Sequence, residues 1–148
     1  MKSKLLILSI FLLSISSMSC MKDRKNIYEG PDVVEFLGIT GTVKKGTVAT
    51  PGVANVTVQL VGHQSTSPTE ISYAIATTGT GVNGTDYTIA GTANKITIPA
   101  NSSSANIVVT AIPANIPTGT KTVVLTLLGN STIGVSANYK TFTLSITQ

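Results

Sequence analysis

Residues 82–112 limit the fold of this chain most, because apolar and polar residues alternate along them twice. The stretch reads VNGTDYTIAGTANKITIPANSSSANIVVTAI. In its first alternating segment, Ile96 and Ile98 lie on either side of Thr97. The second segment places on one face Ile107, Val109 and Ala111. Period-two alternation bounded by Asn-Gly and by Pro-Ala-Asn-Ser is typical of β-hairpins. The stretch therefore predicts an all-β fold.

Further alternating segments lie on both sides, and turn signals recur about every ten residues. The predicted strands cover residues 33–39 (with 41–45 as a continuation after a kink at Gly41), 53–61, 70–77, 122–128 and 139–147. About seven short strands in one domain predict an immunoglobulin-like antiparallel β-sandwich. Nothing follows the last strand in the printed sequence, so we expect it to be an edge that can pair with a partner's strand.

The N-terminal segment has the composition of an export signal. Lys2 and Lys4 precede an apolar run from Leu5 to Met18. This run is too short to span a membrane, which takes about 20 residues, and it matches the apolar region of a secretory signal peptide. We therefore expect the sandwich to be preceded by a signal peptide at residues 1–19.

The signal ends at Ser17-Met18-Ser19-Cys20, and Cys20 is the only cysteine of the chain. The segment resembles the lipobox of bacterial lipoproteins, with Ser17 where that pattern favours Leu, as in the relaxed form common in Bacteroidetes. The resemblance implies lipidation of Cys20. A single free thiol would be a liability in an exported protein, and lipidation removes it. The alternative is a stray cysteine in a signal peptide.

Residues 21–32 read MKDRKNIYEGPD, a mixed-charge segment that predicts a solvated tether. Twelve extended residues reach roughly 40 Å. Lys22-Asp23 weakly resembles the export signal of Bacteroidetes surface lipoproteins, which carries more acid. An unspecific spacer is the alternative, so the orientation at the outer membrane stays open. The expected organisation is a signal peptide (1–19), a lipidated cysteine with its tether (20–32) and a β-sandwich (33–148).

The turn Gly84-Thr85-Asp86-Tyr87, followed by ITIPANSS at residues 96–103, resembles a motif of the Calx-beta domain. It is also similar to the related sandwich of Bacteroidetes surface lipoproteins. The likeness covers about residues 53–148 and is most specific over 84–112. It implies an immunoglobulin-like sandwich of two antiparallel sheets.

In the calcium-binding members of this family, a cluster of acids follows the strand that matches residues 107–112. Here residues 113–121 read PANIPTGTK and hold no carboxylate. Because Ca²⁺ takes six to eight oxygen ligands, Asp86 alone cannot supply a site, and we expect neither metal nor cofactor. We expect Gly84, Asp86 and Tyr87 to form a structural turn, in which Asp86 accepts hydrogen bonds from backbone N–H groups.

Nucleic acids and nucleotides are poor candidates as ligands. Removal of the signal peptide leaves a net charge of about +2 with no basic stripe, so the sequence does not favour nucleic-acid binding. Residues 79–84 match the glycine pattern G-x-G-x-x-G. A dinucleotide site needs a helix directly after that pattern, and Thr85 to Ile89 has no helical character. The glycines fit a hairpin connection better.

The sequence gives little support for catalysis, and we expect no enzyme activity. His63 is the only histidine, so only His63 can be the base of a serine triad, and a solvated loop residue is the simpler interpretation. Glu70 and Asp86 are candidates for a glycosidase carboxylate pair, but nothing in the sequence brings them together.

The main functional hypothesis is a non-catalytic lipoprotein, anchored to the outer membrane through Cys20 and possibly surface-exposed. It would act in display or adhesion, or as an accessory subunit of a glycan-capture complex, with a surface protein or glycan as partner. The alternative is a ligand-binding module for carbohydrate or calcium, which needs a concave face with exposed aromatic residues. A small hydrolase is the third hypothesis and needs His63 beside a serine.

Overall fold

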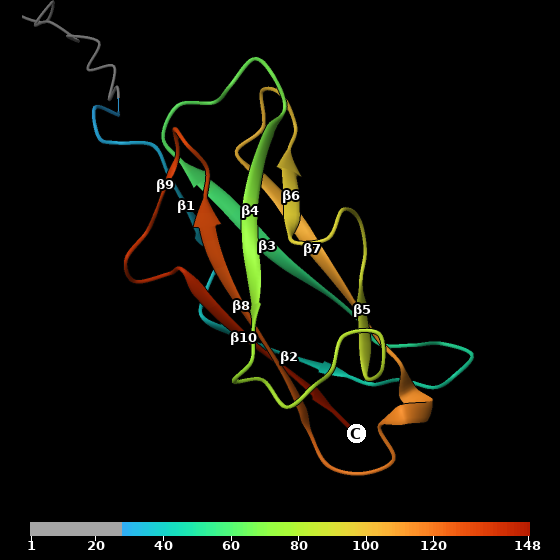
Figure 1. Ribbon diagram of the computed structural model, residues 1–148. Helices are drawn as coiled ribbons and strands as arrows, with labels where there is room; N and C mark the ends of the chain where they lie inside the picture. Colours follow the sequence, from blue (N-terminus) through green and yellow to red (C-terminus); the bar gives the residue numbers. More distant parts are fainter. Residues whose placement is uncertain (1–27) are drawn as a thin grey trace, which may run out of the picture.

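The computed structural model describes residues 28–148, which form ten strands and one short 3₁₀ turn (η1, Pro113–Asn115). Two five-stranded sheets face each other (Figure 1). The first sheet has the order β5 (Tyr87–Ile89), β7 (Ser104–Ala111), β3 (Val53–Val61), β1 (Val33–Phe36) and β9 (Gly134–Val135). The second has the order β2 (Thr40–Lys44), β10 (Thr141–Thr147), β8 (Lys121–Gly129), β4 (Thr69–Ala76) and β6 (Lys95–Ile98).

The core lies between the sheets and is built by the alternation seen in the sequence. From Ile107 on β7 and from Val56 on β3, every second residue is buried, because successive side chains of a strand point to opposite faces. The largest fully buried side chains include Phe36, Ile71, Leu125, Leu144 and Ile146. Burying each such side chain contributes about 1.5–3 kcal/mol. The predicted all-β sandwich is confirmed. It has more strands than expected, because the predicted first strand is two strands, β1 and β2, and because β9 is too short to show a period.

The chain changes sheet at Gly38, and not at a kink in one continuous strand as we expected at Gly41. Gly38 has a φ of +106°, which is open to glycine and strained for other residues. β1 therefore ends in the first sheet and β2 begins in the second. Gly41 has a different role, because a Cβ there would lie 2.8 Å from the ring of Phe142.

The last strand is not an edge, and this expectation was wrong. β10 lies between β8, with which it is antiparallel, and β2, which pairs with it in parallel over Thr40–Lys44. β1 and β9 form a second parallel pair, so the sheets are not purely antiparallel. The parallel partner of β10 comes from the start of the domain, and alternation along β10 cannot reveal such a distant pairing.

The predicted tether ends inside the packed structure. The Asp32 carbonyl accepts a hydrogen bond from the Gly134 N–H at 3.0 Å, and its carboxylate accepts one from the His63 N–H at 2.8 Å. The chain thus enters the sandwich beside β9 and ends at the opposite end (Figure 1). Cys20 and most of the predicted tether lie outside the described residues. Within residues 28–148, no helix is long and apolar enough to cross a bilayer.

Candidate functional site

Asp86 is the only buried charged residue among those the structure describes, at 3% exposure. It lies in the turn Val82–Tyr87, where its Oδ2 accepts a hydrogen bond from the Val82 N–H at 2.9 Å. The turn also closes through its backbone, since the N–H groups of Thr85 and Asp86 both donate to the Val82 carbonyl. Gly84 provides the left-handed residue, with a φ of +81°. We call this turn, together with residues 113–121, the Asp86 corner.

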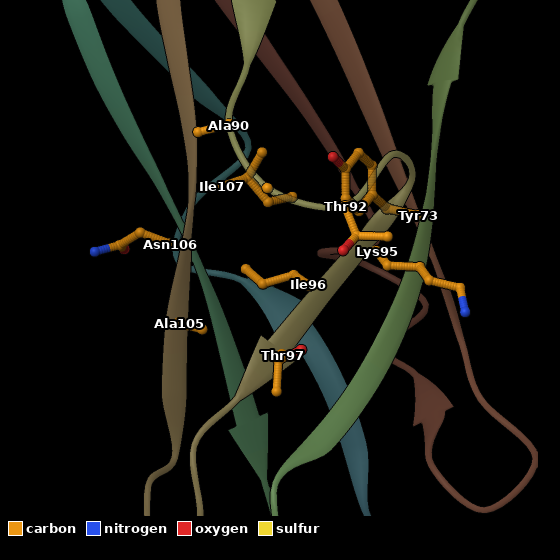
Figure 2. Close-up of a pocket in the computed structure, with 10 residues that line it drawn as sticks. Tyr73, Ala90, Thr92, Lys95, Ile96, Thr97, Ala105, Asn106 and Ile107 are labelled. Carbon is orange, nitrogen blue, oxygen red and sulfur yellow. The ribbon is translucent and has the colours of Figure 1, made fainter.

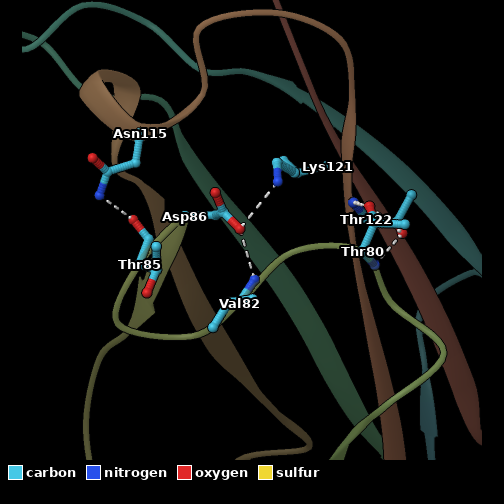
Figure 3. Close-up of polar contacts among 7 residues, drawn as sticks. All are labelled: Thr80, Val82, Thr85, Asp86, Asn115, Lys121 and Thr122. Carbon is cyan, nitrogen blue, oxygen red and sulfur yellow. Dashed lines mark hydrogen bonds and ion pairs between the residues drawn. The ribbon is translucent and has the colours of Figure 1, made fainter.

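A lysine faces the buried carboxylate. Lys121, the first residue of β8, places its Nζ 3.5 Å from Asp86 Oδ2 (Figure 3). A carboxylate in a low-dielectric site is costly unless it is paired and hydrogen-bonded, and Asp86 has both kinds of partner. The Lys121 ammonium therefore supplies the positive charge that balances the Asp86 carboxylate.

Fixed donors also hold the loop that follows β7. Asn115 Nδ2 donates to the Thr85 carbonyl at 2.6 Å and so joins the loop to the turn (Figure 3). Lys45 Nζ donates to the Ile116 carbonyl at 2.6 Å, and Gln148 Nε2 donates to the same oxygen at 3.3 Å. The Ile116 side chain is completely buried. Donors from two distant parts of the chain, Lys45 and Gln148, thus satisfy the Ile116 carbonyl.

Two of the three glycines in residues 79–84, Gly79 and Gly81, allow close packing against β8. A Cβ on Gly79 would lie 2.7 Å from the Thr122 carbonyl oxygen, and a Cβ on Gly81 would lie 3.2 Å from it. The Gly81 N–H donates to that oxygen at 2.9 Å. Among the described residues no helix follows the motif; β5 does. Close contact with β8 therefore explains Gly79 and Gly81, and the positive φ of the turn explains Gly84.

Tyr87, the third predicted turn residue, is fully buried, and its hydroxyl has no hydrogen-bond partner within residues 28–148. Burial raises the pKa of its phenol, and the charges of Asp86 and Tyr73 raise it further. The ring contributes to the core. The hydroxyl makes no hydrogen bond within the described residues, so the free-energy cost of removing it from water is not offset.

Replacing Tyr87 by phenylalanine should therefore stabilise the protein. Removing an unsatisfied buried hydroxyl is expected to add about 1 kcal/mol to the free energy of unfolding, or about 4 °C to the midpoint. The pKa of Tyr87 is higher in the folded protein than in the unfolded chain, so deprotonation above about pH 10 favours unfolding and lowers the stability of the wild type. The variant has no such group and should lose less stability in alkali. Thermal unfolding at pH 7 and pH 11 measures both effects.

Tyr139→Phe is the matched control, because Tyr139 is 44% exposed. We expect no change in its midpoint. A lower midpoint for Tyr87→Phe would mean that the hydroxyl makes a stabilising bond and would contradict the prediction.

The remaining candidate residues are dispersed. His63 Nδ1 lies 3.0 Å from Asp32 Oδ1, and the hydrogen bonds from His63 lower the pKa of Asp32. The His63 side chain is 61% exposed. Glu70 pairs with Lys95 at 2.6 Å on the surface, so Glu70 and Asp86 have different partners. No group of three or more His, Cys, Asp or Glu residues gathers within the described chain.

A cleft of about 290 Å³ opens between β6 and β7, away from the Asp86 corner. Ile96 and Ile107 point into the space between the two strands, and Thr92 and Tyr73 lie at one end (Figure 2). Asn106 points its side chain away from the cleft. Sequence reasoning missed this cleft, because a gap between two sheets depends on where strands stop.

The Lys121–Asp86 pair was also absent from the sequence predictions. Its partners are far apart in the chain and meet because β8 of the second sheet starts beside the turn before β5 of the first. A lysine that ends an acid-free loop was the available signal. Only the sheet topology brings that signal opposite Asp86.

No protein-family model and no curated protein matches the sequence. Solved structures do match. The apo form of the Calx CBD1 domain has a TM-score of 0.60 at 16% identity, over 80% of this chain and 97% of that one. The Calx CBD2 domain has a TM-score of 0.59 at 10% identity, over 81% and 90%.

A third similar structure is a candidate carbohydrate-binding protein from Bacteroides ovatus ATCC 8483. Its TM-score is 0.58 at 10% identity, over 78% of this chain but 37% of that protein. At these identities the likeness establishes the fold alone. The chain has a Calx-beta-like, immunoglobulin-like β-sandwich fold.

Proposed function

We propose that this protein is a non-catalytic lipoprotein of the outer membrane, held by a lipid on Cys20, whose sandwich contacts a surface protein or glycan without calcium. The observation that carries the calcium-free part is the Lys121 ammonium 3.5 Å from Asp86 Oδ2. The corner is neutralised from within, and every residue from 113 to 121 lacks a carboxylate. A divalent cation would meet one carboxylate and a positive side chain there, where it needs several charged oxygens.

The lipoprotein part rests on the sequence, namely on an apolar run that ends at a lone cysteine. Several acyl chains on one residue, at about 0.8 kcal/mol for each buried CH₂, hold a protein durably on a membrane. A domain anchored in this way can act by binding partners that lie at the same membrane. The Bacteroides ovatus neighbour is a candidate carbohydrate-binding protein, which makes a glycan one of the partner classes to test.

The hydrolase alternative is favoured by one observation, the His63–Asp32 pair at 3.0 Å. Such a pair forms two members of a triad, and the third must be a nucleophile on the other ring nitrogen. No hydroxyl of the described residues is hydrogen-bonded to His63. The pair is also open to water, because 61% of the His63 side chain is exposed. These features fit a surface loop contact better than an activated base.

The test is partner capture on native membranes combined with activity screens. The full-length protein, tagged and expressed in a strain that lacks the native copy, is cross-linked on intact cells and recovered with its contacts. We expect the same partner in millimolar Ca²⁺ and in chelator, and background turnover in glycosidase, esterase and peptidase screens.

The outcomes separate the hypotheses. Capture that is lost in chelator contradicts the calcium-free proposal. Turnover that disappears in His63→Ala and persists in Glu70→Ala promotes the hydrolase. Tight binding of a soluble sugar with no captured partner promotes the ligand-binding module.

A further inference from the structure

Exposed apolar side chains gather on the side of the sandwich at which the chain enters. They come from the crossover between β1 and β2 (Leu37 and Ile39), from the end of β8 (Leu128) and from the loop before β10 (Tyr139). The two connections that change sheet, from β1 to β2 and from β9 to β10, both lie at the left of the domain in Figure 1, below the entering segment. We call these four residues the entry face.

Backbone hydrogen bonds hold the two connections side by side. The Phe36 N–H donates to the Tyr139 carbonyl at 2.9 Å, and Leu37 follows Phe36 directly. The Thr143 N–H on β10 donates to the Ile39 carbonyl at 2.9 Å. Leu37 and Ile39 are nevertheless 66% and 54% exposed. Their side chains therefore meet the surroundings of the protein from a backbone that is fixed by its neighbours.

Leu128 extends the entry face on the β8 side. The Leu127 N–H donates to the Lys140 carbonyl at 2.8 Å, which continues the antiparallel pairing of β8 and β10 beyond the end of β10. The next two opposite residues in this direction are Leu128 and Tyr139, and both are exposed. Cross-strand neighbours in such a ladder are close enough for their side chains to interact.

Single exposed apolar residues are ordinary on a protein surface. Val48, in the loop after β2, and Val82, in the turn before β5, fit that description. Both of these loops lie away from the two connections (Figure 1). The entry face differs from them because three segments, distant in the sequence, bring its apolar residues to one place.

The proposed lipid anchor brings a bilayer within reach of this face. From Cys20 to Tyr28 the chain advances eight residues, which span at most about 29 Å. β1 has four residues, so Leu37 lies roughly 17 Å along the strand from Asp32. The permitted reach exceeds this distance. A domain anchored at Cys20 can therefore lie on its side with the entry face against the lipid.

The chemistry of the entry face suits the boundary between lipid headgroups and acyl chains. Aliphatic side chains such as Leu37 and Ile39 gain from entering a fluid apolar phase, which needs no shaped partner. Tyrosine has an apolar ring and a polar end, and it is enriched at membrane interfaces. Aliphatic contact with tyrosine at its rim is typical of proteins that lie on a bilayer surface.

Charge does not favour anionic lipid at this face. Glu29, Asp32 and Glu35 lie in or directly after the entering segment, whereas Lys140 is the positive residue that follows Tyr139. Attraction to anionic headgroups cannot drive the contact with this balance of charges. The contact should therefore form on zwitterionic lipid and persist at high salt, which screens interactions between exposed charges.

We propose that the entry face docks the sandwich on the bilayer that holds its lipid anchor, with Leu37 and Ile39 entering the acyl boundary and Tyr139 at the headgroup level. This inference rests on the proposed anchor at Cys20 and adds an orientation to it. The opposite edges of the two sheets, β5 with β7 and β6, then face away from the membrane.

A single tryptophan can report the contact, because the chain has none of its own. The full-length Tyr139→Trp protein is processed in cells, purified from membranes and reconstituted in phosphatidylcholine vesicles. We expect its emission to move to shorter wavelength, and lipids brominated near the headgroup end of their acyl chains should at least halve it, at low and at high salt. The matched control is Val48→Trp, which should not be quenched. An unquenched tryptophan at position 139 overturns the proposal.

A second pair of variants tests the aliphatic residues themselves. Leu37→Asn and Ile39→Asn are introduced together into the Tyr139→Trp protein, and an unchanged unfolding midpoint confirms that the fold is kept. Each lost side chain should lower the ratio of docked to undocked protein roughly tenfold or more, so quenching should disappear. Val48→Asn with Val82→Asn is the matched control and should keep it. Quenching that survives the change at Leu37 and Ile39 overturns the entry face.

The remaining outcomes separate this docking from the anchor. An intact mass with acyl groups, together with an unquenched reporter, overturns the docking and leaves the anchor in place. A mass without acyl groups overturns both. An emission shift without quenching by brominated lipid means that protein covers the face, and it also overturns the proposal; cross-linking between copies then identifies a dimer.

Discussion

Cys20→Ser is expected to shift the protein from the membrane fraction to the soluble or unprocessed fraction. We expect the apolar run before Cys20 to direct export, and the proposed acyl chains would supply nearly all of the membrane affinity at about 0.8 kcal/mol per buried CH₂. Without the thiol no acyl chain can attach. Fractionation with immunodetection measures the shift, and intact mass measures the acyl groups on the native protein.

Met21→Ser is the matched control, because it changes the next residue and leaves the thiol in place. It should remain in the membrane fraction. A membrane-bound Cys20→Ser protein, together with a native mass that lacks acyl groups, would remove the lipid anchor from the proposed function. The proposed contact between the sandwich and a partner would then have to be explained without a membrane anchor.

Asp86→Ala is expected to cause the largest loss of stability of any polar substitution in the body, about 2–4 kcal/mol. The change leaves the Val82 N–H without its acceptor and the Lys121 ammonium beside a buried, uncharged wall. For a domain of this size we expect a midpoint lower by roughly 10 °C. Thermal and urea unfolding measure it.

Glu70→Ala is the matched control for Asp86→Ala. The Glu70–Lys95 pair is shorter, at 2.6 Å, but both side chains are about half exposed, at 53% and 45%. Exposed pairs contribute about 0–1 kcal/mol, so burial should decide the difference. A double-mutant cycle with Lys121→Met isolates the pair, and a coupling energy near zero would contradict the assignment.

Calcium provides a further check on the Asp86 corner. A ligand at 100 times its dissociation constant adds about 2.7 kcal/mol to the stability of a protein that binds it only when folded. Because Lys121 already faces Asp86, the midpoint should be the same in millimolar Ca²⁺ and in chelator. A rise of several degrees would contradict the calcium-free proposal.

Long strands were predictable because their pattern is local. β3 runs from Val53 to Val61 as predicted, since Val56, Val58 and Leu60 alternate with polar residues and all three are buried. β9 has two residues, Gly134 and Val135, and no period can show in so short a strand. β9 forms because β3 pairs with only one side of β1 and leaves the other side free. This depends on how the sheet is assembled and not on the local sequence.

The sites were less predictable than the fold because each depends on the meeting of distant segments. Asp86 could be assigned to a turn from its neighbours, but Lys121 reaches it only through the pairing order of the second sheet. The cleft exists because β5 stops at Ile89 and β7 continues past it. The sequence shows where the alternation of a strand ends. Only the pairing of strands in the sheet shows whether the adjacent strand is left without a partner at that point.

The position of β1 has a mechanical consequence. β1 begins directly after Asp32 and lies between β3 and β9, with four residues in register against β3. Its hydrogen bonds run perpendicular to the strand. A pull on the chain at Asp32 along β1 therefore loads these bonds in shear, all at once, and they cannot be peeled apart singly. Under the proposed anchor on Cys20, drag on a captured partner would reach the sandwich through β1, which is paired on both sides. The domain should therefore resist unravelling from that end.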